Sequence, residues 1–226
     1  LDDLTRLEAL QQFRKHANTP VQLLIVRPLR AWQLDSLRAM GFGEEDLVIW
    51  EGGKARVEKL YVSPARRADT DAHEWLRRQA AEYAGCREET AASRRIYISR
   101  ADADERQVVN EQELFSALEA RGFELFRLTE LDYCAQVRLF WEADFVVAPH
   151  GAGLTNLVYS RPGAALFELT PSREIRGHFQ RLCDSLGLAY ERTLCRTAGS
   201  SMVVDVDEVL PLIDRFLQKR RLPGSF

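Results

Sequence analysis

Short apolar runs alternate along the chain with longer segments in which apolar residues recur every three or four positions. A short continuous run predicts a buried strand, and recurrence with the helical period predicts a helix packed on one face. The predicted strands are Val21–Val26, Leu47–Trp50, Leu60–Val62, Ile96–Ile98, Phe145–Ala148 and Ala164–Leu169. The predicted helices are Asp3–Lys15, Trp32–Met40, Asp71–Ala84, Glu111–Ala120, Asp132–Trp141, Glu174–Leu186 and Val206–Lys219. This alternation is typical of α/β units around a parallel sheet.

Polar residues at the ends of several helical segments supply start and stop signals. Asn110 with Glu113 three residues later forms a capping-box pattern, and Gly122 follows the end of the same helix. Thr129 with Asp132 has the pattern of a second cap.

A polar stretch, Glu88–Arg95, has neither helical nor strand periodicity and predicts a boundary between two doubly wound α/β halves. We place these halves at residues 1–90 and 91–226. The first looks incomplete, because 90 residues are few for such a half at roughly 30 residues per βαβ unit.

Charge and hydropathy argue against two kinds of partner, nucleic acid and the membrane interior. The net charge is −3 with no basic stripe, so nucleic acid is not expected as a ligand. No apolar run approaches the roughly 18 residues of a membrane span. Neither feature indicates an oligomeric state.

The four cysteines are far apart and form no C-x-x-C pair, and each lies in or beside a predicted helix or strand. We interpret Cys86, Cys134, Cys183 and Cys195 as reduced structural thiols. Together with the absence of a signal-peptide pattern near Leu1, this favours the cytoplasm, with a position peripheral to the inner membrane as an alternative.

A glycine-containing loop reading His150-Gly-Ala-Gly-Leu-Thr-Asn156 lies between the predicted strand Phe145–Pro149 and a predicted short helix, Leu154–Tyr159. Loops of this kind lie at the carboxyl edge of a parallel sheet, where a helix N-terminus offers unpaired N–H groups to a phosphate. The glycines permit close approach and positive φ. We therefore expect a phosphate loop; a tight turn whose glycines serve packing alone is the alternative. The candidate ligands are His150, Gly151, Ala152, Gly153, Leu154, Thr155 and Asn156.

Further candidates follow two neighbouring strands. Glu168 is expected at the end of its strand, where a carboxylate binds ribose hydroxyls, or else is a solvated acid. Ser99 and Arg100 follow another strand, and Arg106 stands six residues after Arg100. Guanidinium groups stabilise a leaving diphosphate without a metal. For Arg106 the alternative is an ion pair with Asp104 or Glu105.

Acidic residues beside these arginines raise the question of a metal site. Asp102-Ala-Asp104 imitates the D-x-D of metal-dependent sugar transferases, but the adjacent arginines compete for its carboxylates. We predict no metal site and no cofactor. Two interpretations are open for Asn110 and Glu111: they begin a helix, or they belong to the site that binds the diphosphate of a sugar donor.

The ordered set of these pieces resembles the family-61 glycosyltransferases, which include plant xylosyl- and arabinosyltransferases, animal O-linked N-acetylglucosaminyltransferases and bacterial capsular polysaccharide proteins. The resemblance rests on Ile98-Ser-Arg100, Arg106, Asn110-Glu111, Gln136, His150–Asn156 and Glu168-Leu169. It covers about Tyr61 to Tyr190.

The resemblance implies a GT-B fold with an acceptor-side half at residues 1–90 and a donor half at residues 91–226. It also implies an inverting, metal-independent transfer from a nucleotide diphosphate-sugar to a glycan, in bacterial surface-polysaccharide synthesis. Family members carry a His-Trp-x-x-Asp-x-Leu-Pro-Arg-Leu stretch, and Leu1–Leu7 is similar to its trailing end, with Asp2 as the expected catalytic base and Thr5 in place of proline. A helix-start acid is the alternative for Asp2 and Asp3.

Two other functions remain open from the sequence. One is a non-catalytic module that binds a nucleotide sugar. The other is a dinucleotide-dependent oxidoreductase, which is disfavoured because Asn156 stands at the third glycine position of that motif. Sugar, base and acceptor are not encoded by any motif in the chain.

Overall fold

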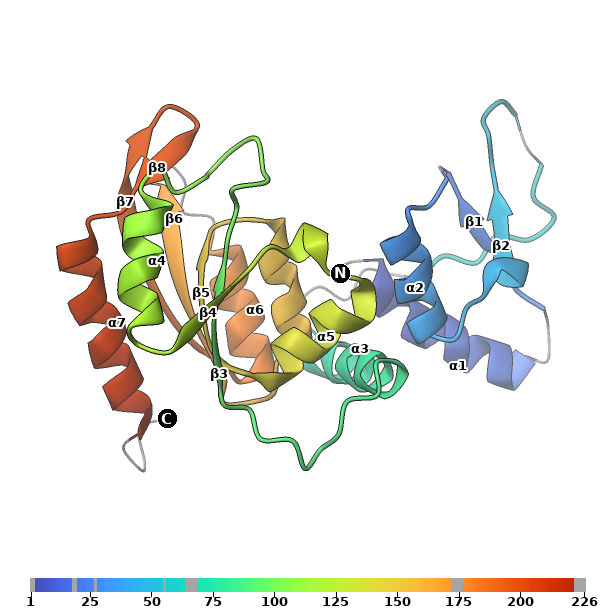
Figure 1. The fold of residues 1–226 in the computed structure, drawn as a ribbon. Coiled ribbons are helices and arrows are strands. Elements are labelled where there is room, and N and C mark those ends of the chain that lie inside the picture. The colour runs from blue at the N-terminus through green and yellow to red at the C-terminus, as the bar shows by residue number, and fades with distance from the viewer. Residues whose placement is uncertain are drawn as a thin grey trace.

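The computed structural model describes residues 3–17, 20–26, 28–54, 56–63, 69–171 and 177–221, which form a mixed α/β structure (Figure 1). The strands are β1 Leu23–Ile25, β2 Leu47–Ile49, β3 Arg94–Ile98, β4 Phe123–Phe126, β5 Ala143–Pro149, β6 Ala165–Pro171, β7 Ala189–Ala198 and β8 Ser201–Val203. The α-helices are α1 Leu7–Ala17, α2 Ala31–Ala39, α3 Thr70–Tyr83, α4 Glu111–Glu119, α5 Tyr133–Glu142, α6 His178–Leu186 and α7 Val206–Arg221. Shorter 3-10 helices are η1 Leu4–Arg6, η2 Glu44–Asp46, η3 Leu128–Glu130 and η4 Ala152–Tyr159.

The larger sheet has six strands in the order β4-β3-β5-β6-β7-β8. All neighbouring pairs are parallel except β7 and β8, which are antiparallel. After β3 the chain moves outward to β4 and then returns to β5 on the other side of β3. The carboxyl ends of β3 and β5 therefore flank the point where the strand order reverses, which is where open α/β sheets bind ligands.

Both faces of this sheet are covered by helices, as the alternation of side chains along β5 requires. Val146 and Ala148 join the core shared with α3, α5, α6 and η4. Phe145 and Val147 face the opposite side and join the core formed with α4 and α7. Figure 1 shows these two helices together on that face of the sheet. The predicted α/β architecture around a mainly parallel sheet is confirmed, while the doubly wound halves of a GT-B arrangement stay a prediction.

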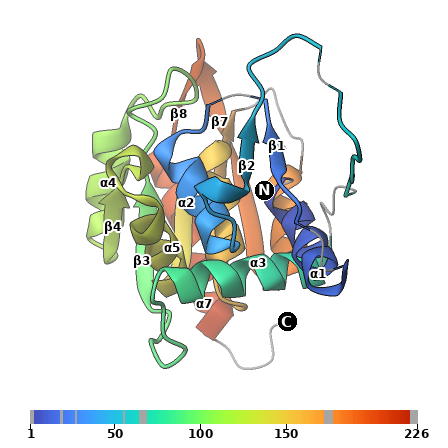
Figure 2. The same cartoon turned by 90° about the vertical axis from the view of Figure 1, so that its right-hand side faces the viewer.

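The N-terminal elements form one parallel β-α-β unit, in which β1 and β2 pair through Leu23–Leu47 to Ile25–Ile49. Figure 2 views the molecule with this unit toward the reader and α3 below α2, which it contacts. The buried side chains of Met40 and Phe42 belong to the same core as Leu76 of α3. The predicted division of the chain at residue 90 stays a prediction.

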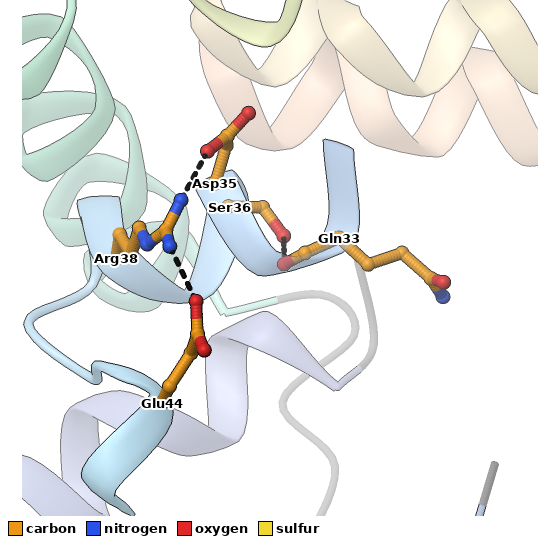
Figure 3. A network of polar contacts seen from close by, with 5 residues as sticks. All are labelled: Gln33, Asp35, Ser36, Arg38 and Glu44. Atoms are coloured by element: carbon orange, nitrogen blue, oxygen red, sulfur yellow. Dashed lines mark hydrogen bonds and ion pairs between the residues drawn. The ribbon is translucent and has the colours of Figure 1, made fainter. Parts of the chain in front are cut away.

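Helix α2 is tied to the following turn by a surface network around Arg38 (Figure 3). Its guanidinium lies 3.1 Å from the Asp35 carboxylate and 2.7 Å from that of Glu44. Ser36 Oγ donates to the Gln33 carbonyl at 2.7 Å. These charges are exposed to solvent, so the pairs orient the turn and stabilise it little.

The predicted strand Leu60–Val62 is wrong. This segment forms no strand and leaves Leu60 and Val62 67% and 76% exposed. Its apolar run has no partner strand beside it in the described part of the chain, so β-propensity alone does not form a ladder. Three strands were not predicted, because β4 and β8 are short and β7 contains many polar residues, as expected toward a partly solvated edge.

The second predicted cap is confirmed only for Asp132, whose carboxylate accepts a hydrogen bond from Ala135 N at 2.7 Å. Thr129 instead donates its hydroxyl hydrogen to the Asp102 carboxylate. Gly122 follows α4 with φ +78°, as its place after a helix end predicts. Helix α6 begins at His178, and the predicted start at Glu174 lies outside the described residues.

Candidate functional site

A cavity of about 220 Å³ lies at the carboxyl ends of β3 and β5, where the strand order reverses. Its floor is formed by the last residues of those strands, and its walls by the segments that follow them and by η3. It is lined by Ile98, Ser99, Arg100, Asp102, Ala103, Leu128, Thr129, Ala148, Pro149, Gly151, Gly153 and Leu154. The predicted glycine loop and the predicted arginine segment therefore meet in one cavity.

Arg100 supplies the cationic group of the cavity wall. Its Nε and Nη2 donate to the Glu105 carbonyl at 3.3 and 3.0 Å, which fixes the plane of the guanidinium. Partial burial and the nearby Arg106 lower the pKa of Arg100, while Asp102 and Glu105 oppose that shift. An arginine remains charged under such shifts, so the cavity wall carries a positive charge.

Gly151 makes room for that guanidinium. A Cβ atom at position 151 would overlap Arg100 Nη1, and its backbone is extended with φ 178°. At Gly153 a Cβ atom would lie 2.7 Å from Leu128 Cδ1. Neither glycine uses the positive φ that its residue type permits. Close approach of side chains, rather than backbone conformation, explains both glycines.

The helix after the loop is the 3-10 helix η4, which begins at Ala152, with Leu154 N donating to Gly151 O at 3.0 Å. The first N–H groups of such a helix have no partner inside it and stay available to a ligand. Ala152 is exposed and Thr155 is half-buried, whereas the Leu154 side chain is 1% exposed and packs in the core. Leu154 therefore serves the site through its backbone and the inner wall of the cavity.

Asn156 acts within the protein. Its Nδ2 donates to Gln136 Oε1 at 2.7 Å, and Gln136 Nε2 donates in turn to the carbonyls of Leu128 and Leu131 at 2.9 and 3.1 Å. This chain of bonds connects η4 to η3 and places the wall formed by Leu128 and Thr129. Sequence reasoning predicted Asn156 but missed Leu128 and Thr129, which precede a helix cap and carry no motif.

Ser99 and Glu111, which were both predicted as site residues, contact each other. Glu111 accepts hydrogen bonds from Tyr97 OH and Ser99 Oγ, both at 2.9 Å. Ser99 Oγ also accepts from Ala101 N at 3.2 Å. Burial and the neighbouring Glu111 raise the pKa of Tyr97 well above its usual value, so the hydroxyl keeps its hydrogen. Glu111 therefore braces the turn that carries Arg100.

Arg106 is held in an unusual backbone conformation, with φ 60°. Its N–H donates to the Ser200 carbonyl at 2.7 Å, which connects the loop after β3 to the loop before β8. Its buried Nε has no hydrogen-bond partner, and no ion pair joins its guanidinium to Asp104 or Glu105 within the described residues. The surface ion pair that was the alternative for Arg106 is therefore not formed.

The predicted capping box at Asn110 is wrong. Asn110 stands at the N-cap of α4, but its side chain forms no cap bond. Its Nδ2 donates to Val204 O at 2.8 Å and to Glu113 Oε2 at 2.9 Å, and its Oδ1 accepts from Val204 N at 3.0 Å. Both amide atoms of Asn110 bond to the backbone of Val204, and these hydrogen bonds replace the expected cap bond. Asn110 thus fixes the loop of Arg106 to β8.

His150 and Glu168 form a buried pair. His150 Nδ1 lies 2.5 Å from Glu168 Oε1, and Tyr190 OH donates to Glu168 Oε2 at 2.6 Å. Strand β6 continues to Pro171, so Glu168 lies inside the strand and the predicted position at its end is wrong. Tyr190 was missed because β7 was not predicted; a strand after α6 would have brought it beside Glu168.

The remaining candidates are acidic. Asp102 lines the cavity and accepts the Thr129 hydroxyl hydrogen. Among the described residues, no three His, Cys, Asp or Glu side chains are grouped so that they could hold a metal ion. Asp3 precedes η1 without a side-chain cap bond. Asp2, the predicted catalytic base, lies outside the described residues.

The chain was compared with known proteins. A bovine (Bos taurus) EGF domain-specific O-linked N-acetylglucosamine transferase is 34% identical over 80 residues, which cover 33% of this chain and 15% of that protein. The chicken (Gallus gallus) protein of the same name is 32% identical over 80 residues, 33% of this chain and 15% of its own length. A beta-1,2-xylosyltransferase of Arabidopsis thaliana is 29% identical over 96 residues, covering 37% of this chain and 18% of that protein.

These matches span less than a fifth of each relative's length. The family model described as Glycosyltransferase 61 is matched more widely, over residues 1–167, which include β3, the arginine segment, the glycine loop and the start of β6. The chain therefore belongs to the glycosyltransferase 61 family.

Proposed function

We propose that this chain transfers a sugar from a nucleotide diphosphate-sugar to a hydroxyl of a glycan, by an inverting reaction that needs no metal ion. The observation that carries the proposal is the cavity where β3 and β5 end, with the Arg100 guanidinium against Gly151 in its wall. A cation and the free N–H groups of a helix start at one sheet edge suit a diphosphate.

The size of the cavity indicates which part of the donor it holds. At about 220 Å³ it is smaller than the roughly 300–1,000 Å³ of pockets that enclose drug-sized ligands. We assign it to the diphosphate and the atoms next to it. Arg100 and Arg106 bind the phosphate oxygens, the N–H groups of Ala152 and Gly153 add to them, and His150 donates to a phosphate oxygen.

In this reaction the acceptor oxygen forms a bond to the anomeric carbon while the bond from that carbon to the phosphate oxygen breaks. The electron pair of the broken bond goes to the nucleoside diphosphate, and the proton of the acceptor hydroxyl goes to a base. In this proposal Arg100 and Arg106 stabilise the negative charge that develops on the leaving group. Asp2 stays the predicted base, since a carboxylate there can take the proton.

The names of the relatives point to the first sugars to test, which are nucleotide-activated N-acetylglucosamine and xylose. A bacterial source and a role in capsular polysaccharide synthesis stay predictions, and the relatives named above come from animals and a plant. No helix in the described part of the chain is long and apolar enough to cross a membrane. A cytoplasmic location likewise stays a prediction.

Calorimetric titration of the chain with uridine, guanosine, adenosine and cytidine diphosphates tests the donor site. One of them should bind, and Arg100→Ala should weaken that binding by ten- to a hundredfold, since a hydrogen bond to a charged group contributes about 1.5–3 kcal/mol. Arg78→Ala, which removes an exposed arginine of α3, is the matched control. Equal binding by all three proteins would reject the assignment of Arg100.

Transfer is tested separately from binding. The panel of nucleotide sugars is incubated with glycan acceptors in the presence and absence of a chelator, and the anomeric configuration of the product is read by NMR. Inverted configuration and unchanged turnover with chelator are expected. Binding of the donor without transfer to any acceptor would instead indicate a nucleotide-sugar binding module.

A further inference from the structure

Glu168 is buried, and both of its carboxylate oxygens form hydrogen bonds with side chains of the protein. Its side chain is 3% exposed, and its two oxygens bond to His150 Nδ1 at 2.5 Å and Tyr190 OH at 2.6 Å. Three residues of β6 follow it before the strand ends, so the carboxylate lies below the edge of the sheet. A ribose hydroxyl outside that edge has no access to it.

A carboxylate in this position is costly to bury unless its partners satisfy it. A carboxylate that binds ribose at the surface would not need these internal partners, because such a carboxylate would remain exposed to solvent until the nucleotide bound. His150, by contrast, is the residue that begins the glycine loop, and its side chain is 15% exposed. The carboxylate therefore acts toward His150 and through it toward the ligand.

We propose that Glu168 and Tyr190 are positioning residues for His150: they hold its hydrogen on Nδ1 and present Nε2 as the ring atom that meets the donor diphosphate. Tyr190 donates to one carboxylate oxygen and leaves the other as the acceptor for Nδ1–H. This inference rests on the proposed function, in which His150 contacts a phosphate oxygen.

The hydrogen count at the ring explains why the arrangement matters. With Nδ1–H directed to the Glu168 side chain, Nε2 is a hydrogen-bond acceptor when the ring is neutral and a donor when the ring carries a second hydrogen. A phosphate oxygen accepts hydrogen bonds, so it selects the form with hydrogens on both nitrogens. Binding of a nucleoside diphosphate should therefore draw a proton to His150 in alkaline buffer.

Among the described residues, Glu168 is the one carboxylate within hydrogen-bonding distance of the His150 ring. Phe179 of α6 lies edge-on to the imidazole at 5.1 Å between ring centroids. Burial, followed by the effect of Glu168, raises the pKa of Cys183 on α6 to about 12, so its thiol is neutral. Burial and Glu168 also raise the pKa of Tyr190 on β7, whose neighbour is the cationic Arg192.

The first test needs no ligand. Nitrogen-15 NMR of histidine-labelled protein, with the His150 signals assigned by their loss in His150→Asn, should show a protonated Nδ1 in mildly acidic and mildly alkaline buffer. Glu168→Gln keeps a side-chain oxygen as acceptor and should keep Nδ1 protonated. Glu168→Ala should lose this fixed assignment and average the two tautomers. A wild-type Nδ1 without its hydrogen in alkaline buffer would overturn the proposal.

The second test uses uridine, guanosine, adenosine and cytidine diphosphates, titrated in buffers of different ionisation enthalpy. For the diphosphate that binds, proton uptake in alkaline buffer should be present in wild type, largely lost in Glu168→Gln and absent in His150→Asn. Tyr190→Phe should weaken binding less than tenfold, because one donor to the carboxylate remains. Unchanged proton uptake in Glu168→Gln would contradict the role of the carboxylate.

The two tests distinguish a failure of the proposed function from a failure of the proposed positioning of His150. If no diphosphate binds, the proposed function fails while the NMR measurement still decides the positioning of His150. Circular dichroism and thermal unfolding of each variant establish that it is folded. If Glu168→Ala does not fold, the NMR result in wild type and the proton uptake in Glu168→Gln decide the proposal.

Discussion

The guanidinium of Arg100 fills the space in which a side chain at position 151 would begin. The two residues come from different strand ends, Arg100 after β3 and Gly151 after β5, and they meet in the wall of the cavity. The glycine is therefore required by the position of the arginine rather than by its own backbone angles.

The substitution Gly151→Ala should displace Arg100 and weaken binding of the nucleoside diphosphate roughly ten- to a hundredfold, which corresponds to about 1.5–3 kcal/mol for hydrogen bonds to a charged group. Calorimetry on a double-mutant cycle provides the control. In an Arg100→Ala background the added methyl group should cost little, because the atom that it displaces is gone. Additive losses would show that Gly151 acts independently of Arg100.

Removing the amide of Asn110 should destabilise the fold. Asn110→Ala loses both hydrogen bonds to the Val204 backbone and leaves those groups unpaired, at a cost of about 1–3 kcal/mol. Urea unfolding measures the loss as a shift of the midpoint at unchanged slope. The control is Gln112→Ala, an exposed position on the same helix, for which a change within about 0.5 kcal/mol is expected. Equal stability of both variants would refute the role of the Asn110–Val204 pair.

Tyr97 and Glu111 should show strong coupling in stability. Glu111→Ala leaves the buried Tyr97 hydroxyl without its partner, which costs about 1–3 kcal/mol. In a Tyr97→Phe background the same change should cost less, because no hydroxyl remains to be satisfied. The coupling is measured by denaturant unfolding of the four proteins, and a coupling of zero would mean that the 2.9 Å bond contributes nothing.

Cysteine reactivity should follow burial. Burial raises the pKa of Cys183 to about 12 and of Cys195 to about 11, from an ordinary value of 9.0. At neutral pH the folded protein should thus carry about a thousandfold less thiolate at Cys183 than an exposed cysteine. Timed alkylation followed by mass spectrometry should modify the half-buried Cys86 and Cys134 before Cys183 and Cys195.

The same shifts set a dependence of stability on pH. Since folding raises the pKa of both buried thiols, their contribution is present below pH 9.0 and declines as pH rises toward about 11 and 12. The Cys183→Ser variant, titrated in parallel, should show a smaller alkaline decline than wild type. Rapid labelling of Cys183 in the native protein would contradict its burial.

Local sequence patterns predicted those strands whose own residues reflect their burial. The runs that become β3, β5 and β6 are buried on both faces, so their hydrophobicity reflects their position directly. The strand β7 could not be predicted in this way, since Glu191, Arg192 and Thr193 form a continuous polar run in a partly solvated strand. Leu60–Val62 shows the opposite error, because an apolar run forms a strand only beside a partner.

Part of the candidate site was predictable in its residues, but the roles of those residues were not. Motif position placed Arg100, Gly151 and Glu168 near one sheet edge, because the ends of parallel strands meet there. Which of them faces the ligand depends on contacts with residues far away in the sequence. Tyr190 occupies one oxygen of Glu168, and only the tertiary structure reveals this.

The bond from Arg106 N to the Ser200 carbonyl has a consequence for the order of assembly. Met202 N also donates to Gln107 O at 2.8 Å, so the arginine loop is bonded to a segment that the ribosome makes almost a hundred residues later. During synthesis β3, β5 and β6 can pair while this loop still lacks its partner. The cavity beside Arg100 should therefore reach its final form only after the β8 segment has left the ribosome.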